Sequence, residues 1–519
     1  MMKLGDLDIA FAGIPGAVQA WHGLVDATTW SAACIQVQVD GGRLLALWGS
    51  DGSAVSASRF AVHAALVVQP GLIILTLPVE GGEYPDVSSV FPAADRMQRA
   101  TFDLLGIAPS APAGRRRWLR HAAWGEDAFP LRKDYPAHGG SAAAETPADT
   151  RYAFVSVAGD GVHEIPVGPV HAGTIEPGHF RFAVVGERVL RLEARLGYKH
   201  KGIEKRFEQL TLEEGARLAA RISCDSTVTY GWAYAMAVES ACGTVVPARA
   251  AALRGLLLEL ERIANHLGDL GFLGNDAGLA FGLSQFSMLK EDLLRANLAL
   301  FGHRYLMDTI VPGGVARDLT PQGAERLRVE LDAIERGLAT LRSIYDEHPG
   351  LQDRFINCGR VEPELAAKLG LIGTAGRASA QAWDLRVQFP CAPYESLDVQ
   401  MATHRNGDVA ARVTVRFDEI VESLRLVRLL LELMPGGEIR VPLRVPPAGA
   451  QGCGWIEGWR GDVFVFLETG PGNTISRLHP HDPSWQNWPV VEHAALGNIV
   501  PDFPLINKSF NLSYSGQDL

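Results

Sequence analysis

The strongest constraint on the fold is a helical repeat of apolar residues between positions 200 and 434. Apolar side chains recur there at i, i+3 and i+4, which places them on one face of a helix. Such a chain buries its core between helices that pack side by side. The repeat occupies six segments, at residues 210–223, 230–242, 248–270, 289–306, 321–347 and 409–433.

The segments on both sides of this region have the spacing of strands. Residues 30–80 contain short β-type runs, such as 33–39, separated by Gly-Gly and Asp-Gly turns. A helix is expected at 93–106, a small antiparallel sheet at 153–195, and short strands from Gly452 onward. The sequence predicts an α+β fold, in which a small N-terminal α/β-sheet domain precedes a mainly α-helical domain that itself begins with a small β-sheet.

The best candidate for a linker is a small, polar run that carries Pro and Gly, at residues 137–152. We therefore expect one domain at 1–136 and a second at 153–519. With 519 residues, the chain is long enough for each domain to bury its own core.

The composition argues against several classes of protein. Hydrophobic residues make up 47% and charged residues 21%, as in ordinary globular proteins, and the net charge of −11 disfavours general nucleic-acid binding. The first residues carry no charged-then-apolar signal pattern. The most apolar window, 61–79, is interrupted by His63, Gln69, Pro70 and Gly71, so it predicts two strands and a turn. A membrane span needs about 20 apolar residues, so we expect a soluble chain that can dock on a membrane subunit.

The cysteines are scattered, and no two have C-x-x-C spacing. We therefore expect no zinc site and no iron–sulfur cluster held by this chain alone. Isolated cysteines in a long chain are typical of reduced thiols that fill the core. The six are Cys34, Cys224, Cys242, Cys358, Cys391 and Cys453.

Three runs in the N-terminal part follow one another in a recognisable order: Y-P-D-V-S-S-V-F-P at 84–92, R-R-R-W-L-R-H at 115–121 and P-L-R-K-D-Y at 130–135. Over residues 28–136 the chain resembles the 30 kDa subunit of respiratory complex I. The basic run at 115–121 in an acidic protein predicts either a solvated loop or a contact with a neighbouring acidic subunit or phosphate.

The rest of the chain resembles the 49 kDa subunit of complex I. It resembles more closely the large subunit of group 4 nickel–iron hydrogenases, of the hydrogenase-4 and formate hydrogenlyase type. The resemblance implies a small partner subunit, similar to the 20 kDa subunit of complex I, that carries an iron–sulfur cluster. It also implies antiporter-like and other membrane subunits, and a peripheral place on the cytoplasmic side of the plasma membrane. The matching runs include G-P-V-H-A-G-T-I-E-P-G-H-F-R-F at 168–182, R-L-G-Y-K-H-K-G-I-E-K at 195–205, E-L-E-R-I-A-N-H-L-G-D-L-G at 259–271 and G-D-V-A-A-R at 407–412.

The resemblance fails at the metal ligands. Hydrogenases of this family hold nickel and iron with R-x-C-G-x-C and D-P-C-x-x-C, which fall here on R-I-S-C-D-S and N-L-S-Y-S-G. A serine hydroxyl stays protonated near neutral pH and is a hard, weak ligand, whereas nickel needs soft thiolates. We therefore predict no nickel–iron centre and no metal in this chain. The four ligand positions are Ser223, Ser226, Ser513 and Gly516.

Complex I relatives also lack these cysteines, and they bind the quinone headgroup with a hairpin His and a Tyr. The hairpin loop here keeps His171 and His179, and His179 has the headgroup-like position. The Tyr position falls within about one residue of Cys224, beside Asp225. A histidine can donate a proton to a reduced carbonyl oxygen. The resemblance thus predicts a quinone or vestigial cavity, and the alternative for His179 is a hydrogen bond that fixes its own loop.

Two further residues match catalytic positions of hydrogenases. Glu204 matches a glutamate that transfers protons beside the metal, and on a helix it would share a face with His200. The alternative for Glu204 is a helix-terminal charge or an ion pair. Arg460 matches an arginine that overhangs the open metal position, where Trp459 in place of proline would narrow the cavity.

One predicted helix carries a polar stripe, because Glu259, Arg262 and His266 are spaced at i, i+3 and i+7. A buried carboxylate stays charged when an arginine lies beside it. The stripe predicts either an architectural ion pair or part of a proton relay towards a membrane arm. Asp225 and Arg412 are weaker candidates for the site.

Together these features predict a hydrophilic-arm subunit of a membrane-bound complex I-like or hydrogenase-related oxidoreductase. The chain would form the cavity next to the partner's iron–sulfur cluster and couple redox change to ion translocation, without a nickel–iron centre. The first alternative is a quinone-reducing subunit. The second is a structural scaffold, which bulky Trp459 and Tyr514 around a closed cavity would favour.

Overall fold

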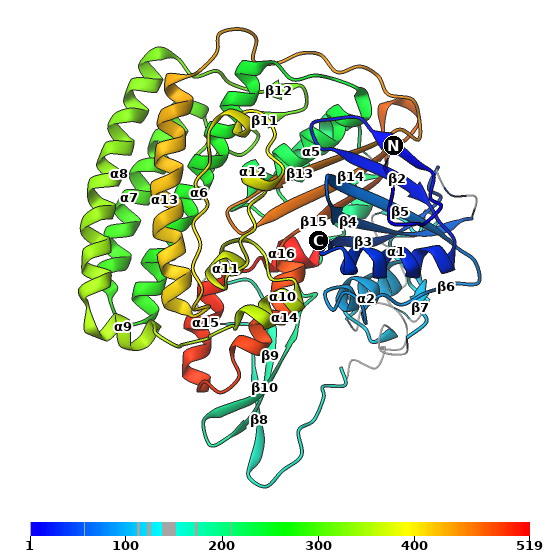
Figure 1. Cartoon of the computed structure of the whole chain (residues 1–519). Helices are drawn as coiled ribbons and strands as arrows, with labels where there is room; N and C mark the ends of the chain where they lie inside the picture. The colour runs from blue at the N-terminus through cyan, green and yellow to red at the C-terminus, as the bar shows by residue number, and fades with distance from the viewer. Residues whose placement is uncertain are drawn as a thin grey trace.

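The computed structural model describes residues 2–54, 56, 58–111, 115–121, 125, 127–137, 152–171, 175–208 and 210–519. Most of the predicted linker, residues 138–151, lies outside the described residues. The predicted α+β class is confirmed, since a mixed sheet with helices is followed by a largely helical region with small sheets (Figure 1).

The N-terminal domain is built on a five-stranded sheet in the order β1-β2-β5-β4-β3, in which only β2 and β5 are parallel. The apolar window at 61–79 forms β4, a turn and β5, as predicted. The elements are β1 Phe11–Ile14, β2 Ala20–Leu24, α1 Ala27–Val39, β3 Arg43–Asp51, β4 Phe60–Val68, β5 Gly71–Val79, β6 Glu83–Tyr84, α2 Ala94–Leu105 and β7 Ala108–Pro109.

The predicted strand at 33–39 is wrong, because these residues end helix α1. The Asp26 carboxylate caps the helix by accepting a hydrogen bond from the Thr29 backbone N–H at 2.7 Å. A helical stripe packs against the sheet and outweighs the β propensity of the run. The stripe consists of Trp30, Ala33, Cys34 and Val37.

The centre of the basic run at 115–121 is not the solvated loop of the first predicted alternative, and its contact with a neighbouring subunit or phosphate stays a prediction. Trp118 is buried, and the Asp103 carboxylate accepts hydrogen bonds from three successive backbone N–H groups of this run. The donors are Trp118 at 2.7 Å, Leu119 at 2.8 Å and Arg120 at 3.1 Å. The run is therefore a structural segment bound to helix α2.

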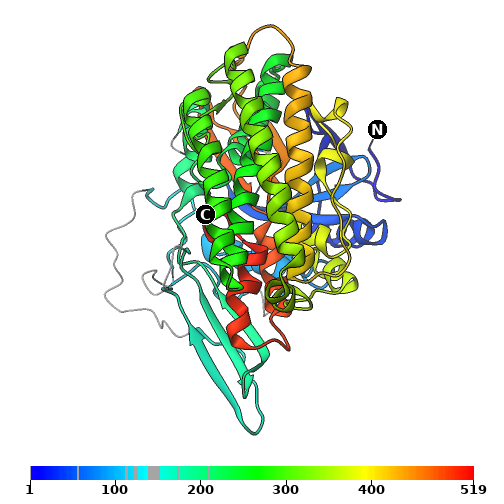
Figure 2. The ribbon, with the colours of Figure 1, turned by 90° about the vertical axis from the view of Figure 1, so that its left-hand side faces the viewer.

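The second domain begins with the predicted antiparallel sheet and continues as a helical bundle. Helices α6, α7, α8 and α13 lie side by side (Figures 1 and 2). Within the described residues, no helix is long and apolar enough to cross a membrane. The elements are β8 Val162–Val167, β9 His179–Val185, β10 Arg188–Arg195, α3 Ile203–Phe207, α4 Leu212–Ala219, α5 Thr227–Cys242, α6 Ala248–Asp276, α7 Ala280–Phe301, β11 Ile310–Val311, β12 Gly314–Val315, α8 Pro321–Glu347, α9 Pro349–Phe355, α10 Pro363–Leu369, α11 Gly373–Ala378, α12 Leu385–Gln388 and α13 Val409–Glu432.

The chain returns to strands after the bundle, as predicted, and then adds three helices. Strand β13 lies so close to helix α5 that a Cβ on Gly454 would be 1.9 Å from the Ala233 carbonyl oxygen. Only glycine fits this approach. The elements are β13 Gln451–Glu457, β14 Asp462–Thr469, β15 Ile475–His481, α14 Ser484–Ala494, α15 Phe503–Phe510 and α16 Tyr514–Asp518.

The two domains share a core where β3 packs on β14 and β15. The Trp48 ring lies 5.2 Å from that of Phe466, centroid to centroid, and both are buried. Polar contacts join the same surfaces, because Ser53 Oγ donates to the Glu468 carboxylate at 2.7 Å. The C-terminal sheet thereby fixes the N-terminal domain in place.

The Asp103 contact gives a test of the fold. The substitution Asp103→Ala leaves three buried N–H groups unpaired, so we expect it to lower the free energy of unfolding by roughly 2–4 kcal/mol. Urea denaturation followed by tryptophan fluorescence measures this loss. The control is Asp95→Ala on the same helix, whose side chain is 40% exposed and pairs with Arg99 at 3.3 Å; it should cost about 0.5 kcal/mol or less. Equal costs for the two variants would contradict the role of Asp103.

Candidate functional site

The two segments that carry the four ligand positions, 221–226 and 511–518, meet in the second domain. The loop 221–226 precedes helix α5, and the C-terminal segment 511–518 contains α16. Ser223 Oγ lies 3.0 Å from Ser513 Oγ, and Ser513 Oγ also accepts a hydrogen bond from the Gly516 N–H at 2.8 Å. Three of the four positions that would hold metal ligands therefore lie close together.

Arg460 fills the space between these segments. Its guanidinium donates two hydrogen bonds to the Asp225 carboxylate, at 2.9 and 2.5 Å, and one each to the Asn511 carbonyl and to Ser226 Oγ. Burial raises the pKa of Asp225, but the charge of Arg460 outweighs burial and lowers that pKa to about 2. The pair is thus charged near neutral pH and joins both segments.

Trp459 closes the same space from the other side of Arg460. Its indole Nε1 donates to the Asp225 carbonyl at 2.9 Å, and its ring centroid lies 3.9 Å from the Arg460 guanidinium carbon. The side chain is 2% exposed. We call Asp225, Trp459 and Arg460 the plug.

The residues present do not fit a nickel–iron centre. The ligand positions offer three hydroxyls, and a cationic guanidinium donates to one of them, Ser226 Oγ, at 3.1 Å. At the fourth position, a Cβ on Gly516 would lie 2.3 Å from an oxygen of Asp482, which accepts a hydrogen bond from the Tyr230 hydroxyl at 2.6 Å. A cysteine there would have to displace this buried pair.

The hairpin histidines bind their own hairpin. The His179 Nδ1 lies 3.1 Å from the Gly168 carbonyl, and the His171 Nε2 lies 2.8 Å from the Gly178 carbonyl. Tyr514 packs on the hairpin, because a Cβ on Gly178 would be 2.6 Å from its ring. These are hydrogen bonds within the loop, as in the alternative predicted for His179.

Cys224 is exposed in this chain, and its place in a quinone or vestigial cavity stays a prediction. Arg412 is buried and binds the Gly359 and Gly407 carbonyls and Ser509, away from the plug.

Glu204 is buried and lies on the side of the second domain that faces the first. It binds Arg477 at 2.7 Å and His479 Nδ1 at 2.8 Å, which is the ion-pair alternative. His200 does not share a helix face with it, because Gly202 has a φ of 66° and helix α3 begins only after this turn. His200 Nδ1 instead lies 2.8 Å from the Asp518 carbonyl oxygen.

The stripe on α6 is fully buried and belongs to a larger charged cluster. Arg262 binds Glu259 at 3.2 Å, and His266 Nε2 lies 2.7 Å from Glu419. Arg377 joins Glu419 to Glu457, at 2.7 and 2.8 Å. We call the following set the buried cluster: Glu259, Arg262, His266, Arg377, Asp384, Arg386, Glu419 and Glu457.

The sequence identified only three members of this cluster. The others come from α11, the region around α12, α13 and β13, more than 100 residues away along the chain. Their signal was present as charged residues within apolar segments, such as Glu419 in α13 and Glu457 in β13. Spacing within one segment gives no indication of which distant segment supplies the partner.

Models of two protein families match the chain. Residues 24–141 match the 30 Kd subunit of the respiratory-chain NADH dehydrogenase, and residues 276–451 match its 49 Kd subunit. Among solved structures, the chain is similar to the membrane-bound sulfane sulfur reductase, an archaeal respiratory membrane complex. The TM-score is 0.65 at 25% identity, over 69% of this chain and 99% of that chain.

Curated relatives match most of the chain. Formate hydrogenlyase subunit 5 of Escherichia coli is 31% identical, over 92% of this chain and 85% of its own length. Hydrogenase-4 component G of the same organism is 30% identical, over 92% and 84%. The C/D subunit of the NADH-quinone oxidoreductase of Bacteroides thetaiotaomicron is 30% identical, over 82% of this chain and 82% of its own length.

The plug predicts a stability difference that depends on pH. The folded-state pKa of Asp225, about 2, lies below the ordinary 3.8, so its pairing stabilises the fold above pH 4 and is lost as the pH falls through 2. We expect Arg460→Met to cost about 1–3 kcal/mol at pH 7. This is less than for a fully buried pair, because the Asp225 side chain is 39% exposed. The cost should shrink below pH 4 in urea titrations.

Arg221→Met is the matched control. Arg221 also binds an aspartate, Asp308, with two hydrogen bonds, but both side chains lie on the surface. Such pairs contribute about 1 kcal/mol or less. The role of the plug would be refuted if both variants lost the same stability at every pH.

Proposed function

The chain belongs to the family that joins a complex I 30 kDa-type domain to a 49 kDa-type or hydrogenase large-subunit domain, and from this membership we propose a specific role. The chain is the hydrophilic-arm subunit of a membrane-bound oxidoreductase complex. It lies next to a partner subunit that carries an iron–sulfur cluster, and it couples redox change to ion movement without a nickel–iron centre.

The buried cluster is the observation that carries the coupling role. It contains three arginines and four carboxylates, so it is neutral when it holds one proton. Burial and the nearby charge of Asp384 raise the pKa of Glu457 to about 7, against the opposing effect of Arg377. The raised pKa makes Glu457 the member of the cluster that would hold this proton, and a proton-coupling group requires a pKa near the working pH.

His266 links this proton to the plug. Its Nε2 binds Glu419 in the cluster, and its ring lies 6.0 Å from the Trp459 ring, edge to face. A change of charge near the plug alters the field on His266 and hence the proton balance of the cluster. In this role, the negative charge of electrons on the partner's iron–sulfur cluster changes the electric field on His266.

A structural scaffold is the second candidate, and the filled space between the two segments that carry the ligand positions favours it. Proton translocation in inverted membrane vesicles that contain the complex distinguishes the two. In the coupling role, Glu457→Gln lowers the number of protons moved per electron while the complex still assembles. In a scaffold, the ratio stays at its wild-type value.

A quinone-reducing role rests on the similarity to the C/D subunit of the NADH-quinone oxidoreductase. Alkylation of Cys224 tests it in the intact complex. A quinone site at this loop predicts slower labelling when a quinone analogue is present. Equal labelling with and without the analogue would leave the coupling role as the better account.

The first prediction of this role concerns metals. In the complex isolated through a tag on this chain, from cells grown with nickel, we expect iron and sulfide from the small subunit and no stoichiometric nickel, because no thiolate pair is available. Elemental analysis with mass spectrometry of the co-purified subunits measures both. One nickel per chain would refute the proposal on its metal content.

The second prediction concerns the proton of Glu457. Its folded-state pKa lies above the ordinary 4.5, so its contribution to stability is present below pH 4.5 and is lost as the pH rises towards 7. The variant Glu457→Gln lacks this loss. We expect its stability between pH 5 and 7 to fall less steeply than that of the wild type, by up to about 1.4 kcal/mol per pH unit.

Urea denaturation at pH 5, 6, 7 and 8 measures this difference. Glu468→Gln is the control, because Glu468 is also buried, lies on the neighbouring strand β14 and binds Ser53 outside the cluster. Its free energy of unfolding should change with pH as steeply as that of the wild type. If Glu457→Gln also changed as steeply as the wild type, the exchangeable proton would belong to another group.

A further inference from the structure

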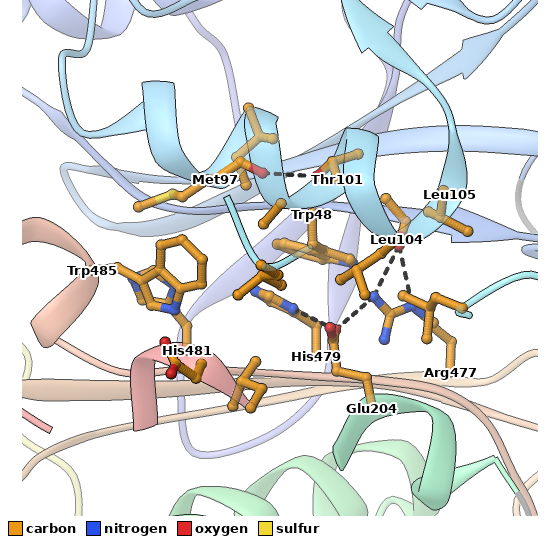
Figure 3. A pocket seen from close by; sticks show the side chains of 17 residues that line it. Trp48, Met97, Thr101, Leu104, Leu105, Glu204, Arg477, His479, His481 and Trp485 are labelled. Atoms are coloured by element: carbon orange, nitrogen blue, oxygen red, sulfur yellow. Dashed lines mark hydrogen bonds and ion pairs between the residues drawn. The ribbon is translucent and has the colours of Figure 1, made fainter. Parts of the chain in front are cut away.

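A small cavity lies between the two domains, apart from the plug. Figure 3 shows Trp48 and helix α2 on one side of it, and Glu204, Arg477 and His479 on the other. Its volume is about 20 Å³. A water molecule needs roughly 10–15 Å³ measured in this way, so the cavity has room for one.

Three ring nitrogens on the side chains that line this cavity have no hydrogen-bond partner among the described residues. They are Nε1 of Trp48, Nε1 of Trp485 and Nε2 of His479. The side chains are only 2%, 4% and 5% exposed. An unpaired buried polar group costs about 1–3 kcal/mol, and native proteins leave few of them. Three such nitrogens on the side chains around one cavity indicate that they share one hydrogen-bond partner.

The chemistry of the three nitrogens differs. An indole N–H only donates. Burial raises the pKa of Glu204, but Arg477 and His479 outweigh burial and lower it to about 2, so Glu204 is a carboxylate at neutral pH. The His479 Nδ1 must therefore carry the hydrogen that Glu204 accepts. Because burial lowers the pKa of His479, the ring is neutral and its Nε2 is an acceptor.

We propose that this cavity is a binding site for one water molecule, which accepts hydrogen bonds from the indole N–H groups of Trp48 and Trp485 and donates one to Nε2 of His479. A metal cation cannot accept from the two indoles, and a halide ion cannot donate to Nε2. Water does both and satisfies all three nitrogens.

Arg477 already joins Glu204 to the Gly49 carbonyl on β3, and the water gives Glu204 a second hydrogen-bonded connection to the first domain. The connection runs from Glu204 through His479 and the water to Trp48 on β3, whose ring also stacks on His479 at 4.9 Å. The water holds His479 in the tautomer that donates to Glu204. His479 is thus a positioning residue for this carboxylate, and the first domain contributes to its environment.

Matched Trp→Phe variants test the site in the full chain. Trp30 is the control, because its Nε1 is also buried without a partner among the described residues, and it does not line the cavity. Trp30→Phe removes an unpaired N–H, whereas Trp485→Phe removes one that binds the water. We expect the Tm of Trp485→Phe to be lower than that of Trp30→Phe by roughly 1–3 °C. Equal Tm values would overturn the proposal.

A density map of the wild-type chain in its complex, at about 2 Å resolution, tests the site without any variant. The expected result is a single peak within about 2.7–3.2 Å of the three nitrogens. An empty cavity, in a map that resolves other buried waters, would overturn the proposal. So would a peak that lies within hydrogen-bond distance of none of the three.

Discussion

The arrangement of the second domain depends on pairing every charge in the buried cluster. Arg262 on α6 binds Glu259, and its other nitrogens donate to the Glu457 and Gly458 carbonyls directly before Trp459. The neighbouring Glu261 accepts hydrogen bonds from the Val228 and Thr229 N–H groups at the start of α5. Helix α6 thus holds both the turn that carries Trp459 and Arg460 and the start of helix α5, which follows the loop with Asp225. Because an unpaired buried charge is strongly destabilising, none of these elements can shift alone.

The sequence predicted the elements whose signal is periodic. The bundle, the small sheet at 162–195 and the C-terminal strands followed from spacing alone. The failures came from features that the run itself does not show, since the Asp26 cap and the packing of α1 on the sheet outweighed the β propensity of 33–39, and the turn at Gly202 separated His200 from Glu204. Propensity averages over several residues, whereas one cap or one positive φ angle decides a boundary.

At the candidate site, too, the sequence predicted the residues with a periodic spacing and missed the others. The polar stripe on α6 was visible, because its three members share one helix face. Its partners Arg377, Glu419 and Glu457 were not, because a buried charge shows that a partner exists without showing which distant segment supplies it. The choice between an ion pair and a relay also needs charge balance, which appears only when all eight members are known.

Arg460 explains how the frame around the two segments that carry the ligand positions persists without thiolate ligands. Besides Asp225, the carboxylates of Asp482 and Asp269 act on this guanidinium and hold its pKa above the ordinary range, against the effect of burial. Such a group of carboxylates needs a central cation, and a guanidinium meets this need with directed hydrogen bonds. Serine and glycine at the four ligand positions leave room for those bonds. The positive charge at the centre is therefore the property that the surrounding frame requires, and in this chain an arginine side chain provides it.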